Sequence, residues 1–90
     1  MAKRVNYKEQ YFKHFDIIDG DQVCEYEYIV NRIIVPANKI HHVLYGAHKV
    51  DHITNWMALS TENHNKCHNE ELDRYEMREI HLQFLNENPY

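Results

Sequence analysis

The sequence has no long apolar run, and this absence excludes a large class of proteins. No segment approaches the roughly 20 consecutive apolar residues that a membrane-spanning helix needs. The first residues, MAKRVNYKEQYFKHF, also lack the uninterrupted apolar stretch of a secretory signal. We therefore expect a cytoplasmic protein that does not enter a membrane.

Glycine, proline and cysteine are also scarce, with two of each in 90 residues. No linker rich in glycine, proline or serine divides the chain, and it contains no internal repeat. A chain of this length has room for one small core, so we predict a single domain over residues 1–90. Cys24 and Cys67 are expected to remain unpaired, because cytosolic thiols usually stay reduced.

Acidic residues are absent from residues 28–50, although the net charge of the chain is −4. Six of the fourteen acidic residues lie in residues 69–90, near the C-terminus, together with only two arginines. A negative net charge argues against a protein that coats nucleic acid indiscriminately, because attraction to phosphate normally requires a basic face. The distribution of charge is therefore more informative than its sum.

The first half of the chain is predicted to form one helix and several strands. The spacing of aromatic residues in 6–15 predicts a short amphipathic helix. Residues 23–35 are rich in β-branched and aromatic side chains, which favours a strand or hairpin that ends at Pro36. Residues 39–45 and 53–60 are predicted to be two further strands, with a polar and basic loop between them.

Two helices are predicted to follow these strands. Ser60 or Thr61 supplies an N-cap hydroxyl for a helix over residues 61–68, with Glu62 in its first turn. Beyond Asn69 the sequence predicts a long C-terminal helix. Its apolar stripe, which we interpret as core or as a surface that faces a partner, is formed by Leu72, Tyr75, Ile80 and Phe84. An α+β fold is expected.

The chain has eight histidines, and the spacing of some of them indicates a site. His64 and His68 lie one turn apart on the same face of the predicted helix, so both can direct a ring nitrogen to one metal ion. A zinc protease would carry Glu directly after the first histidine, where Asn65 stands. A zinc finger with two cysteines and two histidines would need a second cysteine upstream, beside Cys24. Neither motif fits.

A different order of residues remains: the pair His41-His42 on a predicted strand, Asn55 at the next strand, and His64 on the helix. With this spacing, and with the segment NWMALSTENH, the sequence resembles the HNH endonuclease family of phage and bacterial nucleases and colicin DNases. The resemblance covers about residues 22–70. It implies a ββα-metal motif, also called the His-Me finger, with an N-terminal helix before it and a long C-terminal helix after it.

The resemblance also implies a role for each matched residue. His42 corresponds to the general base that takes a proton from the attacking water, and His41 to the metal ligand before it. Asn55 corresponds to the residue that holds the loop and orients the base. His64 corresponds to the second metal ligand, and His68 to a third ligand found in the colicin-like subset. The implied cofactor is one divalent ion: Mg²⁺, Mn²⁺, Zn²⁺ or Ni²⁺.

Two features of the chain require further comment. Adjacent residues in a regular strand point to opposite faces, so we expect the backbone to bend or leave the ladder around His41-His42. Many relatives also hold a structural zinc with four cysteines, at positions that read CEYE (24–27) and STEN (60–63) here. Without those cysteines the core and the helices must hold the fold, and Cys24 and Cys67 are interpreted as free, partly buried thiols.

Other residues near the motif have weaker signals. His48 and His52 lie in the loop between the strands, where they can contact a phosphate but are more commonly solvated. Trp56 is predicted to anchor the core between sheet and helix. His14 and His81 lie outside the motif and have no assigned role. The candidates for contacts to the DNA backbone are Arg32, Lys39, Lys49 and Lys66.

The implied function is a metal-dependent endonuclease that hydrolyses DNA phosphodiester bonds, by nicking or by double-strand cleavage. The alternative is a catalytically inactive HNH-like metal-binding module that acts in nucleic-acid or protein interaction. The acidic C-terminus favours the module, whereas the presence of His42 favours the enzyme. DNA is the expected partner, and phage packaging or recombination proteins are further candidates. If a phage encodes the chain, the expected location is the cytoplasm of the host cell. A homodimer and a monomer fit equally well.

Overall fold

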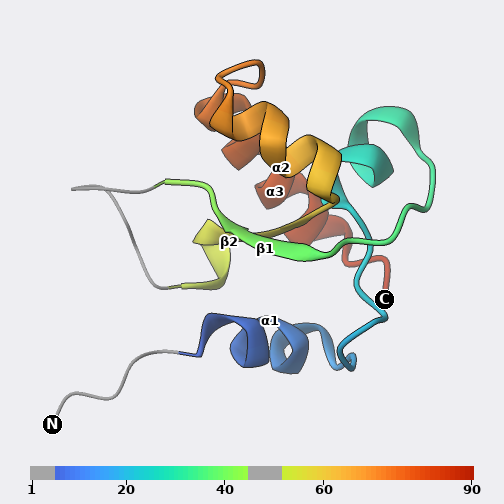
Figure 1. Ribbon diagram of the computed structural model, residues 1–90. Coiled ribbons are helices and arrows are strands. Elements are labelled where there is room, and N and C mark those ends of the chain that lie inside the picture. The colour runs from blue at the N-terminus through green and yellow to red at the C-terminus, as the bar shows by residue number, and fades with distance from the viewer. Residues whose placement is uncertain (1–5, 45–51) are drawn as a thin grey trace, which may run out of the picture.

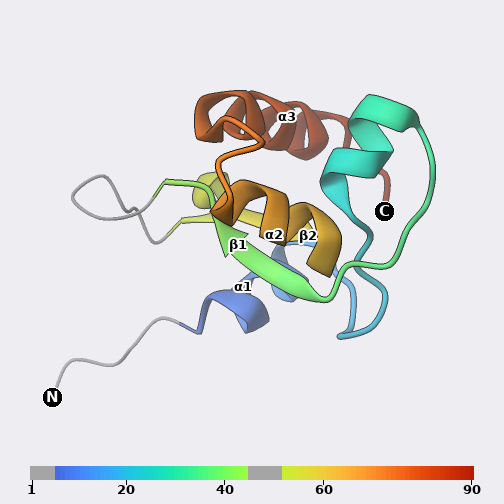
Figure 2. The same ribbon diagram turned by 45° about the horizontal axis from the view of Figure 1, so that its top comes forward.

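A two-stranded antiparallel sheet with helices on both sides forms the framework of the protein (Figure 1). The structure is a computed structural model and describes residues 6–44 and 52–90. Strand β1 (Lys39–His42) pairs with strand β2 (Trp56–Leu59). Helix α1 (Tyr7–Phe15) lies on one side of this sheet, and helices α2 (Thr61–His68) and α3 (Arg74–Glu87) lie on the other (Figures 1 and 2). The α+β class is confirmed, with the element order β1, β2, α2.

Helix α1 forms as the aromatic spacing predicts. The Asn6 side chain accepts a hydrogen bond from the backbone N–H of Glu9, which satisfies one of the free donors at the start of the helix. The helix ends at Asp16, whose φ of 56° lies in the left-handed region. Tyr11 and Phe15, one turn apart, are the buried residues of the helix and join it to the core.

The prediction of a strand or hairpin over residues 23–35 is wrong. The structure has a single bridge between Val23 and Pro36, and the chain between them contains a π-helical turn, η1 (Glu27–Asn31). β-branched residues form a strand only where a neighbouring strand and a core face accept them. Here the turn instead places the side chain of Glu25 among buried hydrogen-bond partners.

The two strands are shorter than predicted and have two different faces. A 3-10 turn, η3 (Ile53–Asn55), precedes β2, and residue 45 lies outside the described residues. Because side chains alternate along each strand, cross-strand neighbours share a face. The face toward α1 carries Ile40, His42, Trp56 and Ala58. The face toward α2 carries Lys39, His41, Met57 and Leu59. The buried residues form two clusters, one that joins Ile40, Trp56 and Ala58 to α1 and to Phe84 of α3, and one that includes Met57 and Leu59.

Helix α2 begins and ends where the sequence predicts. The Ser60 hydroxyl accepts a hydrogen bond from the Asn63 N–H at 3.2 Å and caps the helix. The Asn63 side chain in turn donates to the Cys24 sulfur and to a Glu27 oxygen, both at 3.2 Å. These hydrogen bonds join the start of α2 to the segment that contains Cys24 and Glu27. Cys24 and Cys67 are both free, and burial raises the pKa of Cys67 to about 11.

Helix α3 begins later than expected. The chain first turns through Glu70, which has a φ of 60°, and Asp73 then caps the helix by accepting from the N–H of Tyr75. Tyr75 is 57% exposed, so it does not belong to the core, and a partner-facing role for this residue stays a prediction. The buried face consists of Met77, His81 and Phe84. None of the described helices is both long and apolar enough to cross a membrane.

Candidate metal centre

Three histidine rings from β1 and α2 meet at the surface of the sheet. The ring centroids of His41 and His64 lie 5.1 Å apart, and those of His64 and His68 lie 4.5 Å apart. The His41 and His68 centroids are separated by 6.1 Å. Each residue offers one ring nitrogen, and these nitrogens all lie within 4.8 Å of one another. The three predicted ligands are therefore close enough to hold one metal ion.

The local structure explains how the three rings come together. His64 and His68 are one turn apart on α2, which Ser60 caps and thereby starts in a defined register. His41 pairs with Met57 across the sheet, on the face that α2 covers. His41 is 7% exposed, whereas His64 is half-buried and His68 is exposed. The cluster is thus closed on the sheet side and open toward solvent.

The electrostatics of the cluster suit metal binding. Burial, and then the neighbouring rings of His64 and His68, lower the pKa of His41 to about 4. Burial, His68 and the charge of Lys39 also lower the pKa of His64. These two imidazoles are therefore neutral near pH 7, the form in which a ring nitrogen binds a metal. Three imidazole nitrogens fit Zn²⁺ or Ni²⁺ better than Mg²⁺, which prefers oxygen ligands.

His42 points to the opposite face from His41. Its ring contacts that of Tyr7 at the start of α1, with centroids 4.5 Å apart and the planes at 64°. β1 remains paired through His42, so the backbone does not leave the ladder at the histidine pair, and it bends directly after it, at Val43 and Leu44, where the Val43 N–H donates to the Asn55 carbonyl. In the described sheet β1 has β2 on one side only, so side chains from both faces reach the open edge of β1.

A hollow of about 260 Å³ lies at this open edge, and the ligand candidates and the base candidate share it. Its walls are formed by Tyr7, Ile40, His41, His42, His64 and His68. The predicted ligands therefore enter from the α2 side, while the predicted base enters from the α1 side. A phosphate in the hollow would meet the two kinds of group from different directions.

Asn55 holds the chain that follows His42. Its side-chain oxygen accepts from the Leu44 N–H at 2.7 Å, and its amide nitrogen donates to the Leu44 carbonyl at 2.8 Å. Asn55 is 3% exposed, so water competes little for these bonds. Asn55 thus fixes the chain at Leu44, and its roles in holding the loop and in orienting the base stay predictions.

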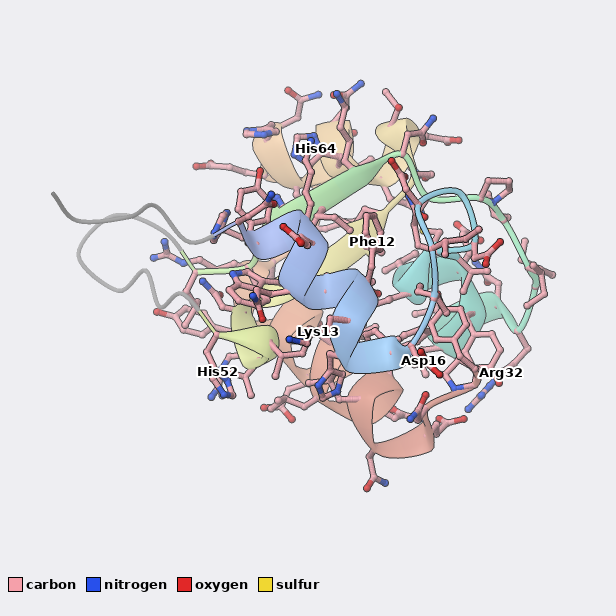
Figure 3. The ribbon with its side chains drawn as sticks, turned by 90° about the horizontal axis from the view of Figure 1, so that it is seen from below. Phe12, Lys13, Asp16, Arg32, His52 and His64 are labelled. Atoms are coloured by element: carbon pink, nitrogen blue, oxygen red, sulfur yellow. The ribbon has the colours of Figure 1, made fainter. Side chains whose placement is uncertain are left out.

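The four candidate DNA-contacting residues have different surroundings. Lys39 is exposed and close enough to His64 to influence its pKa. The Nζ of Lys66 lies 3.6 Å from Oε1 of Glu62, one turn earlier on α2. The guanidinium of Arg32 makes two hydrogen bonds to Glu87, at 2.8 and 3.1 Å, and lies far from His64 in Figure 3. Lys49 lies outside the described residues, as does His48.

Sequence reasoning missed the contribution of three residues. Tyr7 lines the hollow although α1 lies outside the predicted motif. His81 and Glu25, to which no role was given, are fully buried and bonded to each other. A signal was available for His81, which falls between Met77 and Phe84 on the buried side of α3. Trp56 is 5% exposed, which confirms it as a core residue.

Comparison of the chain with protein-family models, with curated proteins and with solved structures finds no match. The interpretation of the site therefore depends on the residues and geometry of this chain. These establish a cluster of three histidines that can hold a metal, and a hollow that the cluster shares with His42.

The metal-free protein should lose stability in acid because of His41. When metal is removed with a chelator, the free energy of unfolding should fall as the pH is lowered from about 6.5 toward about 4. In this window the unfolded chain binds a proton at His41 and the folded chain does not, so protonation favours unfolding. The contribution is at most about 3 kcal/mol. Urea unfolding measured across this window should show a weaker pH dependence for His41→Gln than for wild type. Parallel curves would contradict the assignment.

Proposed function

We propose that the protein is a metal-dependent nuclease of the HNH type that hydrolyses DNA phosphodiester bonds. The observation that carries the proposal is the shared hollow, where His41, His64 and His68 meet on one side and His42 lies on the other. A purely structural metal site has no use for a fourth imidazole beside its ligands. Phosphodiester hydrolysis requires both a proton acceptor and positive charge, and this arrangement supplies a place for each.

Each residue then has a defined task in the reaction. His42 accepts the proton of the attacking water, since imidazole is the side chain best suited to proton transfer near neutral pH. His41, His64 and His68 hold the divalent ion. When bound, that ion supplies positive charge that stabilises the phosphoryl and leaving 3′ oxygens. Asn55 fixes the backbone at Leu44 and so limits the movement of the chain that carries the base.

The order and contacts of the elements support the HNH type. A histidine pair on β1, an asparagine before β2 and two histidines on α2 follow the order of the ββα-metal motif. Cys24, Glu27 and Asn63, at three positions where relatives bind zinc, are joined by hydrogen bonds. In Figure 2, α2 lies between α3 and β1, which separates the acidic C-terminal helix from the strand that carries His41 and His42.

The test is cleavage of a supercoiled plasmid by protein that has first been treated with EDTA. We expect no cleavage with EDTA present, and nicked or linear product when Mn²⁺, Zn²⁺, Ni²⁺ or Mg²⁺ is added in excess. Isothermal titration calorimetry should detect metal binding by wild type and its loss in His64→Ala. Asn65→Ala is the matched control, because this exposed residue lies on the same helix beside His64. Metal binding without cleavage by any ion would contradict the enzyme and support the inactive module.

A further inference from the structure

A second hollow, of about 280 Å³, lies between α1 and the turn η3. Its lining residues are Gln10, Lys13, His14, His52, Ile53 and Trp56. Among these described residues there is one fixed positive charge, on Lys13, and two imidazoles, but no carboxylate. Figure 3 shows Lys13 on α1 and His52 on the same face of the molecule. The chemistry of the lining therefore suits a negatively charged ligand.

The polar groups of this hollow are mainly hydrogen-bond donors. His52 accepts the Thr54 N–H at its Nδ1, at 3.3 Å, so in the neutral ring the proton lies on Nε2, which is a donor. Trp56 is 5% exposed, and no residue within 6–44 or 52–90 accepts a hydrogen bond from its buried indole N–H. An indole N–H can only donate a hydrogen bond, so any group that pairs with it must be an acceptor. The Lys13 ammonium adds three more donors.

We propose that this second hollow binds a phosphate group. A phosphate offers several acceptor oxygens with negative charge, which matches the Lys13 ammonium and the two imidazoles that line the hollow beside the Trp56 ring. The Trp56 ring lines the hollow, so a bound phosphate changes the surroundings of the indole. None of the four side chains belongs to the metal cluster, so this is a separate site.

The position of the hollow indicates where the phosphate comes from. Trp56 pairs with His42 across the sheet, and the Tyr7 ring lies 4.5 Å from that of His42 and 6.5 Å from that of Trp56. Along α1, Tyr7 lines the first hollow, whereas Gln10 and His14 line the second. The two hollows are thus neighbours along one face of α1. If the first receives the scissile phosphate, the second is placed for another phosphate of the same DNA strand, an identification that depends on the proposed function.

Binding can be tested without cleavage by working in EDTA. Trp56 is the single tryptophan of the chain, so its indole N–H gives one identifiable signal in a ¹H–¹⁵N NMR spectrum. We expect this signal and the His52 ring signals to shift on addition of a short DNA duplex. Lys13→Gln should weaken duplex binding about threefold to fivefold. It should also reduce the slope of log K against log salt by about 0.9, the value for one lost phosphate contact.

Lys8→Gln is the matched control, since Lys8 is an exposed lysine of α1 that does not line the hollow. It should change the salt slope and the Trp56 shift little.

Inorganic phosphate is the second ligand tested. Saturable shifts of Trp56 with inorganic phosphate but not with the duplex would support the phosphate site and assign it to a free anion. Absence of a Trp56 shift with both ligands, or equal losses in Lys13→Gln and Lys8→Gln, would overturn the proposal. Failure of plasmid cleavage with intact duplex binding would refute the nuclease alone.

Discussion

Replacing Glu25 with alanine should lower the free energy of unfolding by about 3–5 kcal/mol, a large part of the stability of a small domain. The Glu25 carboxylate is fully buried and accepts three hydrogen bonds. They come from the Tyr11 hydroxyl at 2.5 Å, the Ala58 N–H at 2.8 Å and the His81 ring at 2.5 Å. Removal of the carboxylate leaves these three buried donors without an acceptor.

The hydrogen bonds of His81 indicate that it forms an ion pair with Glu25. Its Nε2 faces the Ile53 carbonyl, which can only accept, and its Nδ1 faces the Glu25 carboxylate. A proton on Nε2 satisfies the carbonyl and a second proton on Nδ1 satisfies the carboxylate, so these contacts favour the charged ring. Burial by itself lowers the pKa of His81, but Glu25 and the Ile53 carbonyl outweigh it, so the pKa is raised. Burial and Glu25 likewise raise the pKa of Tyr11 well above its usual range.

Urea unfolding followed by circular dichroism measures this effect, with Glu62→Ala as the control. Glu62 is exposed and forms an ion pair with Lys66 one turn away, so its removal should cost less than about 1 kcal/mol. The charged His81 contributes fully below its unfolded pKa of about 6.5, and this contribution is lost as the pH rises through the raised folded value. The difference between wild type and Glu25→Ala should therefore shrink at alkaline pH. A Glu25→Ala loss no larger than that of Glu62→Ala would show that the buried pair contributes little.

Replacing His42 with alanine should reduce the rate of plasmid cleavage by about 10²- to 10⁴-fold, the usual contribution of a general base. Metal affinity should be retained, because His42 points to the α1 side of the sheet and is not one of the three histidines whose ring nitrogens lie together. His41→Ala should behave differently. It removes one of the three imidazoles that can hold the ion, so metal affinity and cleavage should both fall.

Two measurements on the same protein samples distinguish the roles of His41 and His42. Metal affinity is measured by calorimetry, and activity is measured by plasmid cleavage. Asn65→Ala again serves as the control and should match wild type in both measurements. If His42→Ala cleaves at the wild-type rate, His42 is not the base. If His42→Ala loses metal affinity as His41→Ala does, His42 is a ligand, and the division of roles between the two faces of β1 is wrong.

The elements predicted best are those whose signals lie within a few residues. Helices α1 and α2 begin at side-chain caps and follow a helical spacing of aromatic or histidine residues, so the sequence shows their limits directly. The segment 23–35 was predicted wrongly because a β-branched run becomes a strand only beside another strand. In the structure that segment contributes Glu25 to the core, and its bonds to Tyr11, Ala58 and His81 depend on elements far away in the chain.

The candidate site also has one part that the sequence predicts and another part that depends on the tertiary structure. The sequence alone determines that His64 and His68 share one face of a helix, because helical periodicity is local. Only the tertiary structure decides that His41 completes their cluster, that His42 faces Tyr7, and that Glu25 pairs with His81. These contacts join segments separated by many residues, and they exist because the sheet is packed between helices on both sides. Such packing depends on the whole chain at once, so no short stretch of sequence contains its signal.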